Sequence, residues 1–382
     1  MESKIRRVSE EYCADNIVRV AKRSNNNRRK YILINPWQGK HVPVSPTKAL
    51  SMMKSLGEKL NYNYPNTKII IGFAETATAI GAIVASVFGD DCMYIHTTRE
   101  EVVAPCLEFL EEHSHAPEQR IITEQLSKSL LATETVIFVD DEISTGRTLC
   151  NIISQIKKHF PILNQRRIVA ASIINRLSNV DEQHLKDCGI VSESLLKLPQ
   201  HNYSTVMERL QTLEPQPIRM DNQYTYESMR IEMKYDTRVG VPITKYIEEC
   251  VDNSYALLSK ISLNKSDDIL ILGTEECMLP GLVLGKKMEE KGYKVYYHAT
   301  TRSPIGISLK DGYPVQNGWQ VSSLYDKTSL RRNYIYNLRS YSQVIIISDT
   351  NLDEHDRIQS LLNVLAINGC HNFYFIGRKL EV

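Results

Sequence analysis

The segment 136–148, VIFVDDEISTGRT, decides the fold that we predict for this chain. Four apolar residues run directly into three carboxylates, and a turn of small and hydroxyl-bearing residues follows. A strand that is buried on both faces of a parallel sheet has such a nearly continuous apolar run. Open sheets of this kind bind ligands at the carboxyl ends of their strands. We therefore predict that Asp140 and Asp141 lie at the ligand-binding edge of a parallel sheet.

The turn that follows the acids has the composition of a phosphate site. Residues 143–148 place small residues and hydroxyls just before a stretch with helical apolar spacing, 148–159. Such a turn directs backbone N–H groups and the positive end of a helix towards one point. Adjacent carboxylates accept hydrogen bonds from the vicinal hydroxyls of a sugar. The segment thus predicts a sugar-phosphate site, with the alternative that its acids and hydroxyls only cap the next helix.

Short apolar runs alternate with helical patterns through the first half of the chain. This alternation predicts a parallel sheet with helices on both faces. The predicted strands are 67–72, 91–96, 135–139 and 167–174, and the predicted helices between them are 77–88 and 148–159. The N-terminal part adds a helix at 48–60 and a strand at 31–34, which we expect to be an accessory to that sheet.

The alternation resumes after a polar stretch, and the second half of the chain resembles the first. The sequence IIIGFAETATAIGAIV from Ile69 resembles LILGTEECMLPGLVLG from Leu270, and at an offset of 200 Glu75 falls opposite Glu275. A Thr-Thr-Arg motif recurs at an offset of 203, and TVIFVDDE recurs as QVIIISDT at an offset of 208. Three matches in the same order predict a repeated domain.

The repeat predicts an α/β fold of two domains, each with a mostly parallel sheet flanked by helices. The predicted boundaries are a first domain 1–210, a linker arm 211–245 and a second domain 246–382. The second domain would be a degenerate copy, because it keeps one acid, Asp349, but lacks the Thr-Gly turn. We therefore expect that it does not bind the same ligand in the same way.

Composition excludes several classes of protein. Of the 382 residues, 42% are hydrophobic and 24% are charged, which is typical of a soluble globular protein. The 46 Lys and Arg nearly cancel the 45 Asp and Glu, so no overall field favours nucleic acid or membrane as a partner. The eight cysteines form no CxxC pair, and the N-terminus has no apolar signal core, so we expect a cytoplasmic protein.

The segment 136–148 resembles the phosphoribosyl-pyrophosphate binding signature of type I phosphoribosyltransferases, and the resemblance implies that fold for the first domain. It implies that Asp140 and Asp141 hold the ribose 2- and 3-hydroxyls and contact Mg²⁺ indirectly, through the donor and water. The loop that binds the 5-phosphate would be Ser144, Thr145, Gly146, Arg147 and Thr148. Two residues depart from the family pattern: Glu142 stands where an apolar residue is commoner, and Arg147 where glycine is commoner.

Two further elements of the family have counterparts here. The sequence GFAETAT, 72–78, occupies the place of the pyrophosphate loop, with Ala74, Glu75 and Thr76 as binding residues. Glu75 is unusual beside a diphosphate; a metal ion, a base or a helix N-cap are alternative partners. Residues 96–120 occupy the place of the mobile hood, whose basic side chains would stabilise the leaving pyrophosphate. The candidate catalytic residues are Arg99, His113, His115 and Arg120, although the two histidines could also be solvated loop residues.

The motif TTRSPI, 300–305, narrows the resemblance to one branch. Together with the signature, it resembles the phosphoribosyltransferases of bacterial tellurite-resistance and stress-response gene clusters, which carry a C-terminal domain named for Thr-Arg-Ser-Pro. This implies Mg²⁺-dependent transfer of ribose 5-phosphate from phosphoribosyl pyrophosphate to an unidentified acceptor, expected to be a nitrogen nucleophile. A regulatory protein that senses the donor or a nucleotide without catalysis is the alternative. A homodimer is possible, since dimers are common in the superfamily.

Overall fold

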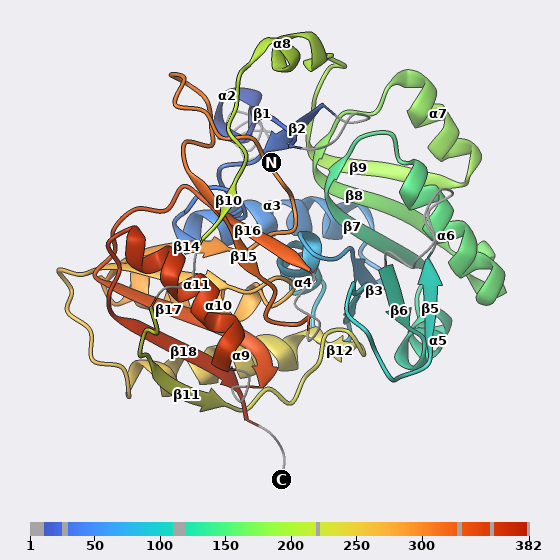
Figure 1. The fold of residues 1–382 in the computed structure, drawn as a ribbon. Helices are drawn as coiled ribbons and strands as arrows, with labels where there is room; N and C mark the ends of the chain where they lie inside the picture. Colours follow the sequence, from blue (N-terminus) through green and yellow to red (C-terminus); the bar gives the residue numbers. More distant parts are fainter. Residues whose placement is uncertain are drawn as a thin grey trace. The chain divides into compact units, whose positions relative to one another are not determined.

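The computed structural model describes residues 11–24, 30–109, 119–218, 222–326, 331–351 and 355–379, which form two compact units (Figure 1). Neither unit is continuous in sequence. The first comprises Met1–Ala14, Leu50–Gln200 and Lys234–Glu249, and the second comprises Asp15–Ala49, His201–Met233 and Cys250–Val382. Compactness thus groups the segment 15–49 with the second unit, whereas we expected it beside the first. The boundaries at residues 210 and 245 stay a prediction.

The first unit contains a six-stranded sheet whose neighbours are parallel except at one edge. Its order is β12 (Val241–Pro242), β4 (Met93–His96), β3 (Thr67–Gly72), β7 (Thr135–Ile143), β8 (Arg167–Asn175) and β9 (Ile190–Lys197). The helices of this part are α3 (Pro46–Asn63), α4 (Ala77–Ala85), α5 (Glu124–Ala132), α6 (Arg147–His159) and α7 (Asn179–Asp187), with a 3-10 turn η1 (Pro161–Gln165). Two short strands, β5 (Cys106–Phe109) and β6 (Gln119–Ile122), form a separate antiparallel pair.

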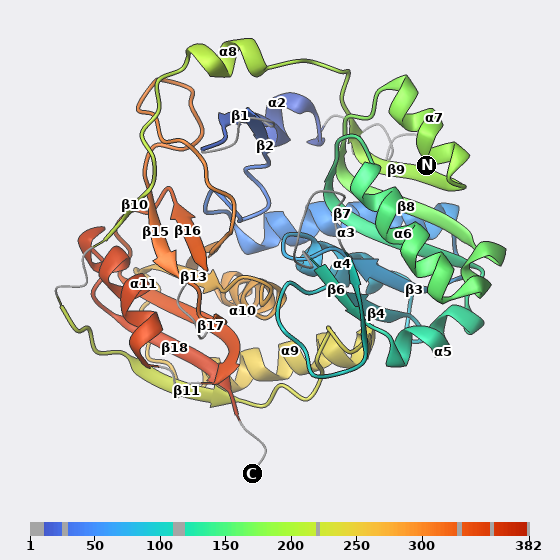
Figure 2. The same cartoon turned by 45° about the vertical axis from the view of Figure 1, so that its right-hand side comes forward.

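Helices cover both faces of this sheet. Apolar side chains of β3, β7 and β8 pack in one core cluster with those of α5, α6 and α7. Figure 2 shows these helices beside the strands of the sheet. Ile95 of β4 belongs to that cluster, while its neighbour Tyr94 packs against Gly81 of α4. Successive strand residues point to opposite faces, so α4 lies on the other side of the sheet. α4 has apolar residues all round, which agrees with its burial.

The second unit contains a five-stranded sheet in which all neighbours are parallel. Its order is β11 (Glu227–Ile231), β18 (Phe373–Arg378), β17 (Gln343–Asn351), β13 (Asp268–Gly273) and β14 (Lys294–Ala299). A smaller sheet joins β10 (Gln216–Pro217), β15 (Gly318–Ser322) and β16 (Arg332–Tyr336), and β1 (Arg19–Lys22) pairs with β2 (Tyr31–Ile34). The helices are α2 (Ala14–Ile17), α8 (Ser204–Arg209), α10 (Leu279–Glu290), α11 (His355–Ile367) and the part of α9 (Ile243–Leu258) from Cys250 onwards.

The strand order repeats between the two units. The order β4-β3-β7-β8 in the first sheet corresponds to β14-β13-β17-β18 in the second, and all these neighbours are parallel. The predicted α/β fold with two parallel-rich sheets is confirmed. That the second is a degenerate copy of the first stays a prediction. The stretch 211–245, expected to be a linker arm, supplies the short strands β10, β11 and β12.

The helices of the described ranges are either too short or too polar to cross a membrane.

Candidate active site

The ends of three adjacent strands bring the predicted site residues of the first unit to one edge. Gly72 pairs with both His96 and Val139, so β3, β4 and β7 reach the same level there. β7 then continues beside β8 as far as Ile143, which carries its acids beyond the end of β3. The loop after β3, the loop after β4 and the acids of β7 therefore share the carboxyl edge, where parallel sheets bind ligands.

Asp140 and Asp141 are both half-buried at this edge. The Asp140 carboxylate accepts a hydrogen bond of 2.9 Å from the backbone N–H of Asp141. A carboxylate has two oxygens and about four acceptor positions, so this bond leaves capacity for the hydroxyls of a sugar. The pair stands where the sequence predicts it.

The turn after the acids is shaped by Gly146. This residue has a φ of +69°, in the left-handed region that favours glycine. A Cβ added to it would meet the side chain of Leu185 at 3.0 Å, so the space for a larger residue is also tight. Gly146 directly precedes α6, and its carbonyl accepts from the N–H of Cys150 at 2.8 Å. Because glycine offers no capping side chain, the first turn of α6 presents backbone N–H groups towards this turn.

The other residues of the predicted phosphate loop lie around the same turn. Ser144, Thr145 and Thr148 are half-buried, and Arg147 is exposed as the first residue of α6. The exposed position explains how an arginine is accommodated where the family usually has glycine. An anion at the start of α6 would also be attracted by its charge.

The loop after β3 is buried and held from the end of β4. Ala74, Glu75 and Thr76 each expose 7% or less of their surface, and the peptide bond between Ala74 and Glu75 is cis. The N–H of Ala74 donates to the Thr97 hydroxyl at 2.9 Å, and the N–H of Thr97 donates to the Gly72 carbonyl at 2.9 Å. These bonds fix the shape of the loop. Thr97 was not among the predicted site residues, because only the strand register shows that it faces this loop.

The predicted hood is only partly within the described residues. Thr98 and Arg120 exchange backbone hydrogen bonds of 2.8 and 2.7 Å, which attach β6 to the end of β4. The Arg120 guanidinium donates to the Glu108 carboxylate at 2.8 Å, and Arg99 is half-buried after β4. His113 and His115 lie outside the described residues. The catalytic roles of these four residues stay predictions.

Glu142, the unexplained departure in the signature, forms an ion pair with Arg176. Both side chains are mostly buried, with exposed fractions of 19% and 26%. Arg176 directly follows β8, and its N–H donates to the Ile143 carbonyl at 3.0 Å. The carboxylate therefore ties the end of β7 to the end of β8. Sequence alone could not reveal this partner, because it depends on the register between the two strands.

Comparison with known proteins identifies the family of this chain. Residues 17–195 match a family model described as "Phosphoribosyl transferase". Residues 236–365 match a second one, described as "TRSP domain C terminus to PRTase_2". The chain is a phosphoribosyltransferase with a C-terminal TRSP domain. No curated protein matches its sequence.

Solved phosphoribosyltransferase structures are similar at a low level. The adenine phosphoribosyltransferase of Trypanosoma brucei, in complex with AMP, pyrophosphate and ribose-5-phosphate, is 13% identical; the match covers 50% of this chain and 79% of that chain, with a TM-score of 0.36. The Saccharomyces cerevisiae enzyme is also 13% identical, with coverages of 50% and 99% and a TM-score of 0.36. Orotate phosphoribosyltransferase from Aeropyrum pernix is 15% identical, with coverages of 55% and 97% and a TM-score of 0.32. Similarities this low do not identify a substrate.

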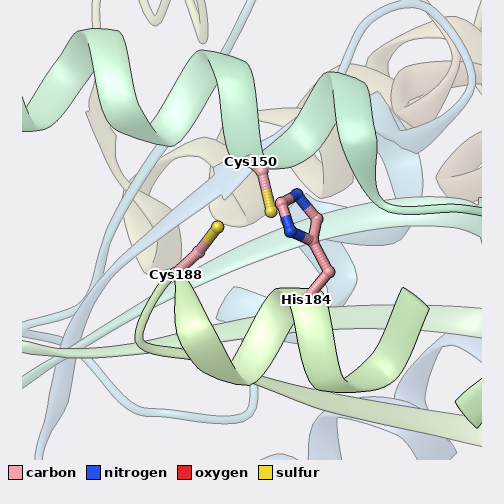
Figure 3. A group of neighbouring side chains, drawn as sticks. All are labelled: Cys150, His184 and Cys188. Atoms are coloured by element: carbon pink, nitrogen blue, oxygen red, sulfur yellow. The ribbon is translucent and has the colours of Figure 1, made fainter. Parts of the chain in front are cut away.

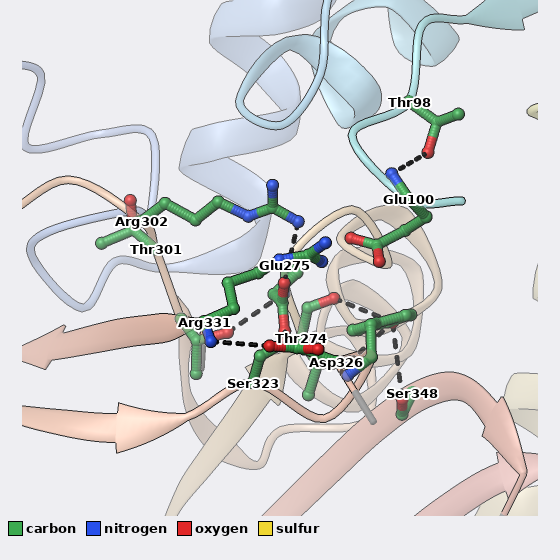
Figure 4. A network of polar contacts seen from close by, with 12 residues as sticks. Thr98, Glu100, Thr274, Glu275, Thr301, Arg302, Ser323, Asp326, Arg331 and Ser348 are labelled. Atoms are coloured by element: carbon green, nitrogen blue, oxygen red, sulfur yellow. Dashed lines mark hydrogen bonds and ion pairs between the residues drawn. The ribbon is translucent and has the colours of Figure 1, made fainter. Parts of the chain in front are cut away.

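The TRSP domain fills the corresponding edge of its own sheet with paired side chains (Figure 4). Glu275 exposes only 1% of its surface and has a φ of +51°. Its carboxylate accepts from Arg302 at 3.2 Å and from the Ser323 hydroxyl at 2.7 Å, and its N–H donates to the Thr300 hydroxyl at 3.0 Å. Arg302 is the arginine of the Thr-Arg-Ser-Pro motif, so this residue holds a buried carboxylate of its own domain.

Proposed function

We propose that the phosphoribosyltransferase moves ribose 5-phosphate from phosphoribosyl pyrophosphate to a nitrogen acceptor, with Mg²⁺, and releases pyrophosphate. The observation that carries the proposal is the pair Asp140–Asp141 at the end of β7, directly before the Gly146 turn and the N-terminus of α6. The two carboxylates can bind the vicinal hydroxyls of a ribose, and the backbone amides that follow them can bind its 5-phosphate.

In this proposal, the side chains orient the donor and stabilise charge. Asp140 and Asp141 accept hydrogen bonds from the ribose 2- and 3-hydroxyls, and the backbone of residues 144–148 binds the 5-phosphate. The bond from ribose C1 to the pyrophosphate oxygen breaks, and a bond from C1 to the acceptor nitrogen forms as that nitrogen loses its proton. Positive charge develops on the sugar and negative charge on pyrophosphate, so basic groups of the hood would favour the transition state. Those groups are Arg99, His113, His115 and Arg120.

The donor set at this edge fits Mg²⁺. This cation prefers oxygen ligands and keeps several waters, and two half-buried carboxylates beside the donor site suit such indirect coordination. Asp140 and Asp141 would hold it through water and through the donor. When bound, Mg²⁺ neutralises charge on the pyrophosphate. The backbone of Ala74, Glu75 and Thr76 would approach that same group from the loop after β3.

The setting of the reaction is also part of the proposal. The resemblance to phosphoribosyltransferases of tellurite-resistance and stress-response gene clusters supports synthesis of a nucleoside-like metabolite in the cytoplasm. Near-neutral net charge supports small-molecule substrates, with neither nucleic acid nor membrane as a partner. We propose a homodimer because dimers are common in the superfamily.

Pyrophosphate release tests the proposal. Purified protein with Mg²⁺, donor and a cell extract of small metabolites should form pyrophosphate, and Asp140→Asn combined with Asp141→Asn should reduce the rate by about 10²–10³-fold. The matched control is Asp91→Asn, an exposed acid that precedes β4 at the opposite edge of the sheet. A double variant as active as the control would contradict the site.

One observation favours the alternative of a protein that senses a nucleotide without catalysis. Glu75 is 7% exposed within the loop assigned to pyrophosphate, and a buried carboxylate there would repel a diphosphate. Nucleotide binding without pyrophosphate formation from any acceptor pool would support the sensor. Pyrophosphate formation by Glu75→Gln at a rate above wild type would show that the carboxylate restrains this reaction.

A further inference from the structure

Two cysteines and a histidine of the first unit converge between α6 and α7 (Figure 3). Cys150 projects from α6, while His184 lies in the last turn of α7 and Cys188 directly follows that helix. The sulfur atoms and one ring nitrogen all lie within 4.8 Å of one another. His184 and Cys188 are four residues apart, a spacing that places two side chains on one face of a helix.

We propose that Cys150, His184 and Cys188 form a site for Zn²⁺ or a similarly thiophilic divalent cation. Zinc takes Cys sulfur at about 2.3 Å and His nitrogen at about 2.0–2.1 Å, usually in a tetrahedron. Ligand atoms in such a tetrahedron lie roughly 3.5–4 Å apart. The observed spacing therefore needs only a small side-chain adjustment to enclose the ion.

The groups around the three ligands favour a divalent cation that is bound by two thiolates. The N–H of Cys188 donates to the His184 carbonyl at 3.1 Å, so the cluster lies at the C-terminal end of α7. The negative end of the helix dipole is located there and stabilises positive charge. Lys157 donates to the Cys188 carbonyl at 2.9 Å, which places an ammonium group near the sulfurs. Two thiolates balance the charge of Zn²⁺, and their two protons are released to solvent on binding.

The exposure of the three ligands indicates an open site. Cys150 is buried, Cys188 is half-buried and His184 is exposed, so solvent reaches the cluster from the α7 side. A structural zinc site has four protein ligands, whereas an open one keeps a position for water. Three protein ligands with an exposed histidine match the open type, which leaves a coordination position for water.

Metal binding at this cluster would act on the donor turn, an extension that rests on the proposed function. Leu185, the neighbour of His184, lies against Gly146, and the Cys150 N–H donates to the Gly146 carbonyl at 2.8 Å. Both helices that carry the ligands thus contact the residue that shapes the turn. An ion that joins α6 to α7 would hold this turn in its present shape and strengthen donor binding.

The test titrates the full chain, stripped of metal and kept reduced, with Co²⁺ and then with Zn²⁺. We expect one Co²⁺ per chain, with the near-ultraviolet absorption of cobalt thiolate, and its displacement by Zn²⁺. Loss of an outer-shell group costs roughly 10–100-fold in metal affinity. Removal of a direct ligand in His184→Gln or Cys188→Ser should therefore weaken binding by at least ~100-fold.

Matched controls separate this site from unspecific binding. His159→Gln removes an exposed histidine at the end of α6, and Cys106→Ser removes a half-buried cysteine of β5; both should bind the metal like wild type. His184 is exposed, so its variant should fold even if Cys150→Ser does not.

Three results would overturn the metal site: no thiolate absorption, unchanged affinity in both ligand variants, or a Cys150–Cys188 disulfide in anaerobically purified protein. Unchanged donor affinity with bound Zn²⁺ would contradict only the coupling. If the variants lose the metal while no donor binds at all, the proposed function fails and the metal site stands.

Discussion

The carboxyl edges of the two sheets carry related residues that differ in their hydrogen-bond partners. In the first unit, β7 ends in Asp140 and Asp141, and the Gly146 turn leads into α6. In the second, Asp349 of β17 accepts a hydrogen bond from the Tyr325 hydroxyl, within a network that also contains Thr274. The same strand order therefore supports a proposed donor site in one unit and a paired, internally bonded edge in the other.

Two glycines that the units share, Gly72 and Gly273, are packing residues. A Cβ on Gly72 would meet the Tyr94 hydroxyl at 2.7 Å, and a Cβ on Gly273 would meet the Tyr297 hydroxyl at 2.4 Å. Both glycines allow a tyrosine of the neighbouring strand to pack against the sheet. The parts that differ are the turn and the acids, which supports the view that these parts serve binding and that folding does not require them.

The largest expected effect in this comparison concerns the buried pair of the TRSP domain. Glu275→Gln leaves the Arg302 guanidinium without its carboxylate, and loss of one partner of a buried pair costs about 3 kcal/mol. Chemical denaturation should show this loss of stability, while donor affinity stays unchanged. As control, Glu248→Gln breaks an exposed pair with Lys245 and should change stability by less than about 0.5 kcal/mol. Equal stability of the two variants would mean that Glu275 does not hold Arg302 as described.

Acid should weaken the second unit more than the first. Burial lowers the pKa of His298 below its ordinary value of 6.5. The pKa of His41 is lowered well below the same value, first by burial and then by the charges of Lys40, His298 and Arg23. The unfolded chain takes up these protons near pH 6.5 and the folded chain does not, so stability is lost as the pH falls below 6.5.

Each histidine contributes at most about 1.4 kcal/mol per pH unit to this loss. His298 occupies the position that Ile95 has in the first sheet, at the offset of 203 seen in the Thr-Thr-Arg motifs. Hydrogen exchange, corrected for intrinsic rates, should show β14 losing protection between pH 7.5 and 5.5 to a greater extent than β4. Equal or greater loss in β4 would contradict the assignment.

The turn that only the first unit possesses can be tested at Gly146. Gly146→Ala forces a side chain into a left-handed residue against Leu185, and we expect a loss of about 1–2 kcal/mol in stability together with weaker donor binding. Gly89→Ala is the matched control, because Gly89 has a φ of +90° but no atom within 4 Å of the added Cβ. If both variants bind the donor like wild type, the turn does not hold the phosphate.

The smallest expected effect is a difference in stability between variants of the two equivalent tyrosines, Tyr94 and Tyr297. The Tyr94 hydroxyl donates to the Thr78 carbonyl at 2.6 Å, whereas the buried Tyr297 hydroxyl has no hydrogen-bond partner among the described residues. Tyr94→Phe should cost about 1 kcal/mol, and Tyr297→Phe should be neutral or slightly stabilising. Thermal denaturation of both variants measures the difference; a larger loss in Tyr297→Phe would refute it.

Much of the fold could be predicted from the sequence because fully apolar runs between helical patterns are a strong signal for parallel strands. The edge position of Asp140 and Asp141 followed from the same signal. The partner of Glu142 could not be predicted, since it depends on the register of β7 and β8. Hydrogen bonds also place Ala74, rather than Glu75, opposite Glu275, because each donates its N–H to the threonine after the neighbouring strand. The offset of 200 hid this difference, whereas an offset of 201, which aligns Gly72 with Gly273, gives the same pairing as the hydrogen bonds.

The grouping of residues 15–49 with the second unit was also not predictable. The sequence of this segment predicts one short strand, 31–34, and contains no feature that indicates which of the two sheets the segment joins. In the structure, Val44 exchanges backbone hydrogen bonds of 2.9 and 2.7 Å with Tyr297, and Nδ1 of His298 lies 3.1 Å from the Gly39 carbonyl oxygen. Such long-range contacts leave no periodic pattern in the sequence.

Direct titration of phosphoribosyl pyrophosphate in the presence of Mg²⁺ tests the central claim that the two edges differ in function. Hydrogen bonds to charged groups contribute about 1.5–3 kcal/mol each, so the Asp140→Asn, Asp141→Asn double variant should bind the donor at least ~100-fold more weakly than wild type. Asp349→Asn, at the corresponding edge of the second unit, should bind it like wild type. Unchanged affinity in the double variant, or an equal loss in Asp349→Asn, would contradict the account.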